Sequence, residues 1–77
     1  MNSKYLRPGF DFALAHVIEE CGEVQAAAGK LLRWGPNAVN PELPPGDQVK
    51  NIVWLRREVA DLRGALDRLS AEMEKMQ

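Results

Sequence analysis

Two pairs of acidic residues have the spacing and the chemistry of a metal-binding site. Glu20 and Glu23 form one pair, and Glu58 and Asp61 form the other. The members of each pair are three positions apart, so both carboxylates lie on one face of a helix. Carboxylate oxygens are the ligands that Mg²⁺ and Mn²⁺ prefer. Four carboxylates brought to one point would therefore form a site for such a cation.

Both pairs lie in segments with the apolar periodicity of a helix. Apolar residues recur at alternating steps of three and four, which is a heptad pattern. They are Phe10, Leu14, Val17, Cys21, Val24, Ala28 and Leu31 in the first segment, and Ile52, Leu55, Val59, Leu62, Leu66, Leu69, Met73 and Met76 in the second. We call these residues the seam of each helix. The pattern predicts helices over about 10–34 and 47–76.

The remaining segments are expected to be irregular. Residues 1–9 form a lead-in, and residues 35–46 form a loop that four prolines partly stiffen. The Gly35-Pro36 step is a helix stop, and Asp47 is the expected N-cap of the second helix.

Two helices of similar length joined by one loop predict an antiparallel hairpin, packed through its seams. Each helix would keep uncovered apolar surface, so we expect the hairpins to oligomerise into a four-helix bundle. A flank of small residues on the first helix, including Gly22 and Gly29, would let a second backbone approach closely. The alternative is that these glycines only weaken the helix, by about 1 kcal/mol each. The fold class is thus all-α, with residues 1–77 as a single domain.

The bulk composition excludes several classes of protein. A net charge of −1 argues against a general nucleic-acid binder, and no apolar run reaches the ~20 residues that a membrane span needs. Cys21 is the single cysteine, so no internal disulfide can form. With no apolar run near the N-terminus to suggest a signal peptide, we expect a cytoplasmic protein.

The heptad register places the two acidic pairs opposite each other. With the seam at positions a and d, Glu20 and Glu58 both occupy position g, and Glu23 and Asp61 both occupy position c. In an antiparallel pair the g edges of the two helices face each other, so the four carboxylates share one flank. Two such charges ~6 Å apart repel by about 3 kcal/mol at an effective dielectric near 20, which favours a bound cation. The alternative is that they decorate solvated helix faces.

The same flank carries groups that suit a nucleotide. Lys30 could bind phosphates, Trp34 and Trp54 offer aromatic faces to a base, and Asn51 adds an amide. Arg33, one position off the flank, could reach a phosphate as a planar fork. Each also has a structural explanation, because cations are favoured near a helix C-terminus and the indoles could cap the end of the bundle.

Two further residues are given no functional role. His16 faces Arg68 across the hairpin on this flank and is interpreted as a solvated histidine. Cys21 lies on the seam and is interpreted as a core residue.

With these motifs in hand, the chain resembles the MazG-like members of the all-α NTP pyrophosphatase superfamily. That family combines E-E-x-x-E on one helix with E-x-x-D on a later one, as residues 19–23 and 58–61 do here. Short members often carry K-x-x-R-F-G between them, and residues 30–35 match it except that Trp34 replaces the phenylalanine. The resemblance covers about residues 10–70. Many members have additional helices that this chain lacks.

The resemblance implies a metal-dependent hydrolase that converts a nucleoside triphosphate, NTP or dNTP, into the monophosphate and pyrophosphate. The ligands of Mg²⁺, or of Mn²⁺ in its place, would be Glu20, Glu23, Glu58 and Asp61. Glu19 would orient a ligand or a water, and Lys30 and Arg33 would hold phosphates. The family also implies a homodimer or homotetramer. Two alternatives are a non-catalytic helical adaptor and a nucleotide-binding regulator without turnover.

Overall fold

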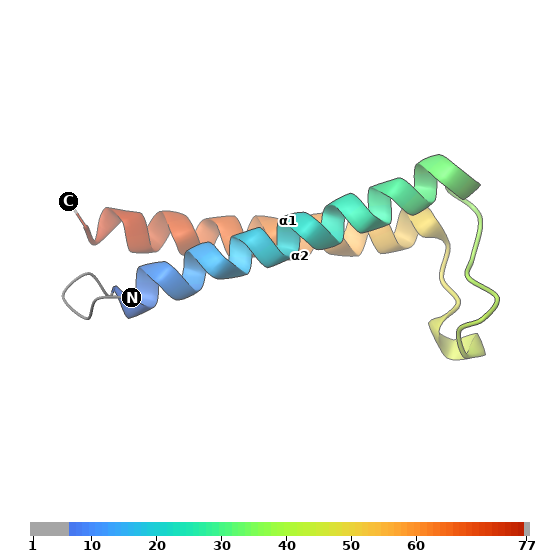
Figure 1. The fold of residues 1–77 in the computed structure, drawn as a ribbon, viewed down its shortest axis with the longest axis horizontal. Helices are drawn as coiled ribbons and strands as arrows, with labels where there is room; N and C mark the ends of the chain where they lie inside the picture. The colour runs from blue at the N-terminus through green and yellow to red at the C-terminus, as the bar shows by residue number, and fades with distance from the viewer. Residues whose placement is uncertain (1–6, 77) are drawn as a thin grey trace.

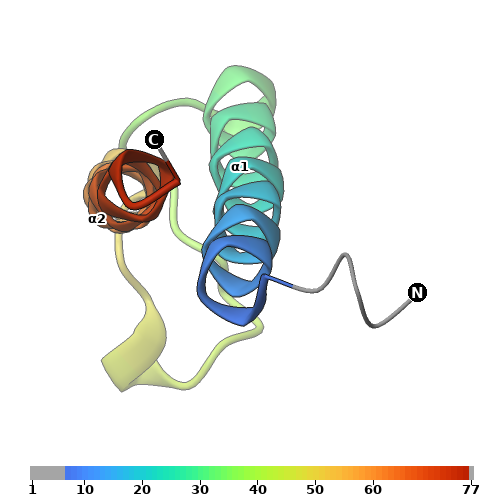
Figure 2. The ribbon, with the colours of Figure 1, turned by 90° about the vertical axis from the view of Figure 1, so that its left-hand side faces the viewer.

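The computed structural model describes residues 7–76, which form two long helices joined by a folded loop. Helix α1 spans Pro8–Trp34, helix α2 spans Asn51–Glu74, and one 3₁₀ turn, η2, spans Pro45–Asp47 between them. The helices run antiparallel, and the loop forms a hook at one end of a hairpin that measures 48 × 22 × 22 Å (Figure 1). From the end, the helices lie beside each other and the loop projects to one side (Figure 2). The expected all-α hairpin is confirmed.

Helix α1 begins two residues earlier than expected and ends where expected. Pro8 occupies its first turn, a position that proline favours because its missing N–H would be unpaired there in any case. Asp11 accepts a hydrogen bond from the backbone N–H of Arg7 at 3.3 Å, which secures the start of the helix. At the other end Gly35 adopts φ 92° and donates its N–H to the carbonyl of Leu31 at 2.8 Å. Residues 1–6 of the expected lead-in lie outside the described residues.

Helix α2 begins later than expected, and Asp47 is not its N-cap. Asp47 lies in η2, and the N-cap position of α2 is occupied by Lys50, which makes no side-chain capping hydrogen bond. The helix begins at Asn51, whose N–H donates to the carbonyl of Ala38 at 2.9 Å, while the N–H of Ile52 donates to that of Pro36 at 3.0 Å. Loop carbonyls therefore supply the partners that an N-cap side chain usually provides. The helix ends at Glu74, two residues before the expected end.

Side-chain amides fix the path of the loop. Gln48 donates to the carbonyls of Leu43 at 2.8 Å and of Pro41 at 3.2 Å. Asn40 accepts a hydrogen bond from the N–H of Glu42 at 3.0 Å, which closes a local turn. These bonds give the proline-rich segment a defined conformation beside the ends of both helices.

The two helices meet along a line different from the expected one. The buried residues are Ala13, Glu20 and Ala27 in α1, and Asn51 and Ala65 in α2. All five occupy heptad position g, whereas every seam residue in the described chain is half-buried or exposed. The expectation that the seams form the centre of the contact is therefore wrong. Alanine at three of these positions allows a close approach of the backbones, because helix separation depends on the side chains at the contact.

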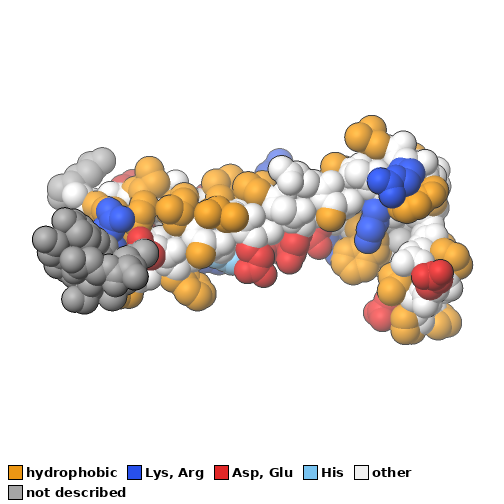
Figure 3. Space-filling view, in the orientation of Figure 1, with side chains coloured by type: hydrophobic (Ala, Val, Ile, Leu, Met, Phe, Trp, Pro, Cys, Tyr) orange, Lys and Arg blue, Asp and Glu red, His pale blue; other side chains and the backbone are white. Residues whose placement is uncertain are grey.

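This contact line leaves part of the seam and several other large apolar residues exposed. No large side chain of residues 7–76 is fully buried. The exposed large apolar residues are Phe12, Leu14, Ile18, Leu32, Trp34, Val39, Leu66, Met73 and Met76. In Figure 3, apolar side chains extend along the helix pair, while the acidic side chains near its middle and the loop lie on the lower side. Neither helix of the described chain is sufficiently long and apolar to cross a bilayer.

The small-residue flank points away from α2. Apart from the adjacent backbone of α1 itself, a Cβ atom at Gly22 or Gly29 would meet no atom of the described chain within 4 Å. That a second backbone packs there stays a prediction, as does the four-helix bundle.

Candidate metal and phosphate site

Three of the four predicted carboxylates converge at the middle of the hairpin. One oxygen each from Glu20, Glu58 and Asp61 lies within 4.8 Å of the other two. Glu20 comes from α1, and Glu58 and Asp61 lie one turn apart on α2. The antiparallel helices bring them together because both acidic pairs fall at the midpoint of their helices. Three oxygens at these separations can contact one small divalent cation.

Two of these carboxylates have a buried oxygen without a partner. Oε2 of Glu20 and Oε2 of Glu58 are inaccessible to solvent, and neither has a hydrogen-bond partner in the described chain. Glu20 as a whole is only 8 % exposed. A buried carboxylate oxygen without a partner is costly, and buried polar groups in native proteins are normally paired. A bound cation would satisfy both oxygens, so the donor set fits Mg²⁺ or Mn²⁺.

The same environment makes two carboxylates hard to ionise. Burial raises the pKa of Glu20, and the nearby charges of Glu23 and Asp61 raise it further, while a hydrogen bond with His16 opposes the shift. Burial also raises the pKa of Glu58, followed by the adjacent carboxyl of Glu23 and the charges of Asp61 and Glu20. Desolvation and like charge both disfavour the anion. Without a cation, Glu20 and Glu58 therefore keep their protons to a higher pH than an ordinary glutamate does.

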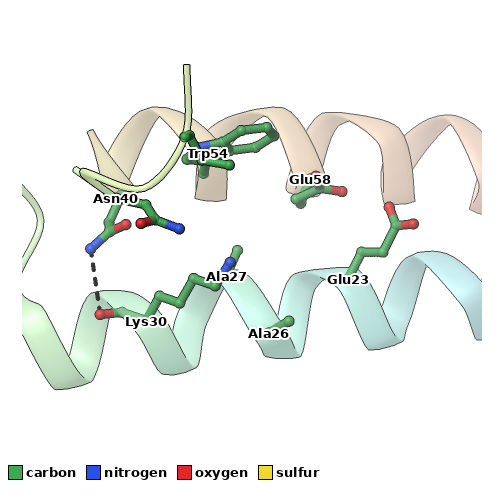
Figure 4. A pocket seen from close by; sticks show the side chains of 9 residues that line it. Glu23, Ala26, Ala27, Lys30, Asn40, Trp54 and Glu58 are labelled. Carbon is green, nitrogen blue, oxygen red and sulfur yellow. Dashed lines mark hydrogen bonds between the residues drawn. The ribbon is translucent and has the colours of Figure 1, made fainter. Parts of the chain in front are cut away.

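The other two predicted acidic residues lie at the margin. The Glu23 carboxyl is close to those of Glu20 and Glu58, but it is not among the three mutually close oxygens. In Figure 4 its side chain extends from α1 toward α2 beside Glu58. Glu19 is exposed on the outer face of α1, where no contact brings it to the cluster.

His16 faces Arg68 across the hairpin, as predicted, and it also contacts Glu20, which the sequence interpretation did not anticipate. Its Nε2 lies 3.2 Å from Oε1 of Glu20, and its Nδ1 lies 2.8 Å from Nη2 of Arg68 on α2. The signal was present in the i,i+4 spacing of His16 and Glu20, which places them on one helix face. The interpretation of His16 as a solvated residue is not supported, because its side chain is only 27 % exposed.

A cavity of about 190 Å³ lies beside the carboxylates. It is lined by Glu23, Ala26, Ala27, Lys30, Asn40, Leu43, Asn51, Trp54 and Glu58. Figure 4 shows Lys30 extending from α1 toward α2, and the indole of Trp54 lying alongside α2. Asn40 and Leu43 come from the loop, and nothing in the sequence indicated them because the path of the loop was unknown. The cavity thus joins carboxylates, an ammonium group and an indole, as predicted for Lys30 and Trp54.

A second cavity of about 510 Å³ lies between the loop and the end of α1. Lys30, Asn40 and Asn51 line both cavities, so the two spaces adjoin. Trp34 lines only this outer cavity and is 59 % exposed. It therefore lies farther from the carboxylates than Trp54.

Two of the predicted substrate-binding residues have other contacts. Arg33 is exposed, lines neither cavity, and places its guanidinium carbon 5.0 Å from the centre of the Trp34 ring. Asn51 donates its amide N–H to the carbonyl of Gly35 at 3.0 Å and to that of Lys30 at 3.5 Å. Asn51 thus ties the start of α2 to the end of α1, and only its amide oxygen is left for a ligand.

The chain was compared with protein-family models, curated proteins and solved structures, and none of them matches it.

Proposed function

We propose that this protein is a Mg²⁺-dependent nucleoside triphosphate pyrophosphohydrolase, which converts an NTP or dNTP into the monophosphate and pyrophosphate. The observation that carries the proposal is the pair of buried, unpartnered oxygens on Glu20 and Glu58, next to a cavity that contains Lys30 and Trp54. The resemblance of residues 19–23, 30–35 and 58–61 to the MazG-like pattern supports the same reaction.

The residues of the site divide into three roles. Glu20, Glu58 and Asp61 would hold the cation, with Glu23 at its margin. A cation bound there would activate water and stabilise negative charge on the phosphates. Lys30 would bind the triphosphate.

The base of the nucleotide would bind in the part of the cavity that Trp54 lines. The face of Trp54 would provide a stacking surface within the inner cavity, which the loop residues Asn40 and Leu43 also line. Hydrolysis of the bond between the α- and β-phosphates consumes one water and releases the two products. The indole is compatible with any base, so the proposal names the triphosphate and leaves the base to experiment.

The proposal includes a homodimer in which two hairpins form a four-helix bundle. Its support is the exposed apolar surface of both helices, since no large side chain is fully buried within residues 7–76. Full burial of one large apolar side chain contributes about 1.5–3 kcal/mol, so covering this surface would stabilise the fold considerably. A tetramer would additionally use the small-residue flank.

The test is a panel of nucleotides assayed for pyrophosphate release with Mg²⁺ or Mn²⁺. We expect Glu58→Gln and Asp61→Asn each to lower the rate by more than ~100-fold, beyond the ~10–100-fold loss that follows when only a ligand-orienting residue is removed. Glu74→Gln, at the exposed end of α2, is the control and should keep the wild-type rate. Unchanged rates in both site variants would show that the assignment is wrong.

The exposed apolar surface of the two helices also favours a second candidate, a helical adaptor without catalysis. An adaptor requires the apolar face but not the carboxylates, so its thermal stability should not respond to Mg²⁺. A regulator that binds without turnover would instead be stabilised by nucleotide with Mg²⁺ while releasing no pyrophosphate. A thermal-shift assay run beside the pyrophosphate assay separates the three.

A further inference from the structure

A hydrogen-bonded chain leads from the surface of α2 to the buried carboxylate of Glu20. Arg68 Nη2 lies 2.8 Å from His16 Nδ1, and His16 Nε2 lies 3.2 Å from Glu20 Oε1. The exposure of the side chains falls along it, since Arg68 is exposed, His16 is 27 % exposed and Glu20 is 10 % exposed. The chain crosses from one helix to the other.

The chemistry of arginine sets the direction of these hydrogen bonds. A guanidinium group is always protonated and can only donate. His16 Nδ1 must therefore accept the hydrogen bond from Arg68, which assigns the ring proton to Nε2. That N–H then donates to Glu20 Oε1. A histidine tautomer is fixed in this way by the partner of its other nitrogen.

This arrangement gives the two oxygens of Glu20 different tasks. Oε1 is held by His16, whereas Oε2 is buried and has no partner in the described chain. We propose that His16 and Arg68 are positioning residues, which anchor Oε1 of Glu20 so that Oε2 is presented to a divalent cation. The inference rests on the metal site of the proposed function, but it concerns binding of the cation and does not require hydrolysis.

A purely structural role for the same contacts makes a different prediction. If the Arg68–His16 bond only ties the two helices together, its loss lowers stability and leaves the cation affinity of the folded protein unchanged. If these hydrogen bonds position Glu20, their loss lowers the cation affinity of the folded protein. Affinity measured on folded protein therefore separates the two roles.

The experiment is a calorimetric titration of the full chain with Mn²⁺ alone, with folding of each variant verified by circular dichroism. We expect His16→Leu to weaken Mn²⁺ binding by ~10–100-fold, the range typical when a residue that orients a ligand is lost. His16→Gln, whose amide can still donate to Glu20, should restore affinity to within a few-fold of wild type. Arg68→Met should weaken binding less than His16→Leu, and the double variant should bind as His16→Leu does.

Arg63→Met is the matched control, because it removes one exposed arginine from the same helix and leaves the hydrogen bonds between Arg68, His16 and Glu20 intact. It should bind Mn²⁺ as wild type does. Wild-type affinity in folded His16→Leu or Arg68→Met would overturn the positioning role. The expected order of Mn²⁺ affinities among the variants would support the positioning role even if the wild type releases no pyrophosphate. The absence of pyrophosphate release would contradict only the proposed hydrolysis. A wild type that does not bind Mn²⁺ would overturn both proposals.

Discussion

At the scale of single residues, the carboxylates differ in what their oxygens contact. Glu20 has one oxygen held by His16 and one without a partner, and Glu58 has one buried oxygen without a partner. Asp61 is exposed yet close to both. Residue type and spacing predicted the cluster, but not which oxygens are left free. That depends on partners such as Arg68, which lies 52 residues from His16 in the chain.

The raised pKa of Glu58 predicts how stability depends on pH when no metal is present. Because burial and the neighbouring carboxylates raise the pKa of Glu58 in the folded state above the ordinary glutamate value, the folded chain binds this proton more tightly than the unfolded chain does. The protonated Glu58 therefore stabilises the folded state fully at pH values below the ordinary glutamate pKa. This stabilisation is lost as the pH rises through the raised pKa of the folded state. Glu58→Gln removes this loss, so its melting temperature should exceed that of wild type increasingly as the pH rises from ~4.5 to 7.

Thermal melts of metal-free protein across this pH range check the prediction, with Glu74→Gln as a control whose offset from wild type should stay constant. A constant offset for Glu58→Gln would contradict it. Saturating Mn²⁺ should reverse the order of the two melting temperatures. A bound ion at 100 times its Kd stabilises the folded state by about 2.7 kcal/mol, and Glu58→Gln has lost one of the carboxylates that would bind the ion.

At the scale of secondary structure, the ends of the helices were predicted only in part. The end of α1 at Trp34 and Gly35 was correct because a glycine with positive φ stops a helix locally. The start of α2 was not, because its first N–H groups are paired with Pro36 and Ala38, residues of a loop whose path is not a local property. The same loop contributes Asn40 and Leu43 to the cavity.

Asn51 is expected to act mainly as a connection between the helices. Asn51→Asp replaces the amide N–H groups with an oxygen facing the carbonyls of Gly35 and Lys30. We expect a loss of about 1–3 kcal/mol in the free energy of unfolding, the usual cost of leaving buried polar groups unsatisfied. Urea unfolding without metal or nucleotide measures it, and Asn37→Asp in the exposed part of the loop is the control. Wild-type stability with weakened nucleotide binding would instead assign Asn51 to the substrate.

At the scale of the whole molecule, the hairpin has polar contacts at its centre and apolar residues at its edge. Its buried line consists of small or polar side chains, while large ones such as Ile18 and Leu66 are exposed. A chain of 77 residues buries little core by itself. Large apolar side chains are therefore exposed in the single hairpin, and the proposed four-helix bundle would bury them.

Leu66→Glu tests this view of the assembly. The seam face should become charged and unable to pair, so the species in solution should shift from an oligomer to the 8.6 kDa single chain, with a lower melting temperature. Sedimentation equilibrium measures the mass. Ala71→Glu introduces the same charge on the same helix away from the seam and should keep the wild-type mass. A wild type that sediments as a single chain would refute the four-helix bundle.

The sequence by itself determined the two helices, the stop after Trp34 and the matched register of the acidic pairs. These follow from apolar periodicity, glycine and proline signals and i,i+3 spacing, which act over a few neighbouring residues. Only the tertiary structure decided which helix flank forms the contact, which loop residues line the cavity, and that His16, opposite Arg68, also contacts Glu20. A heptad repeat is compatible with contact along the seam or along position g, and the choice depends on packing summed over both helices.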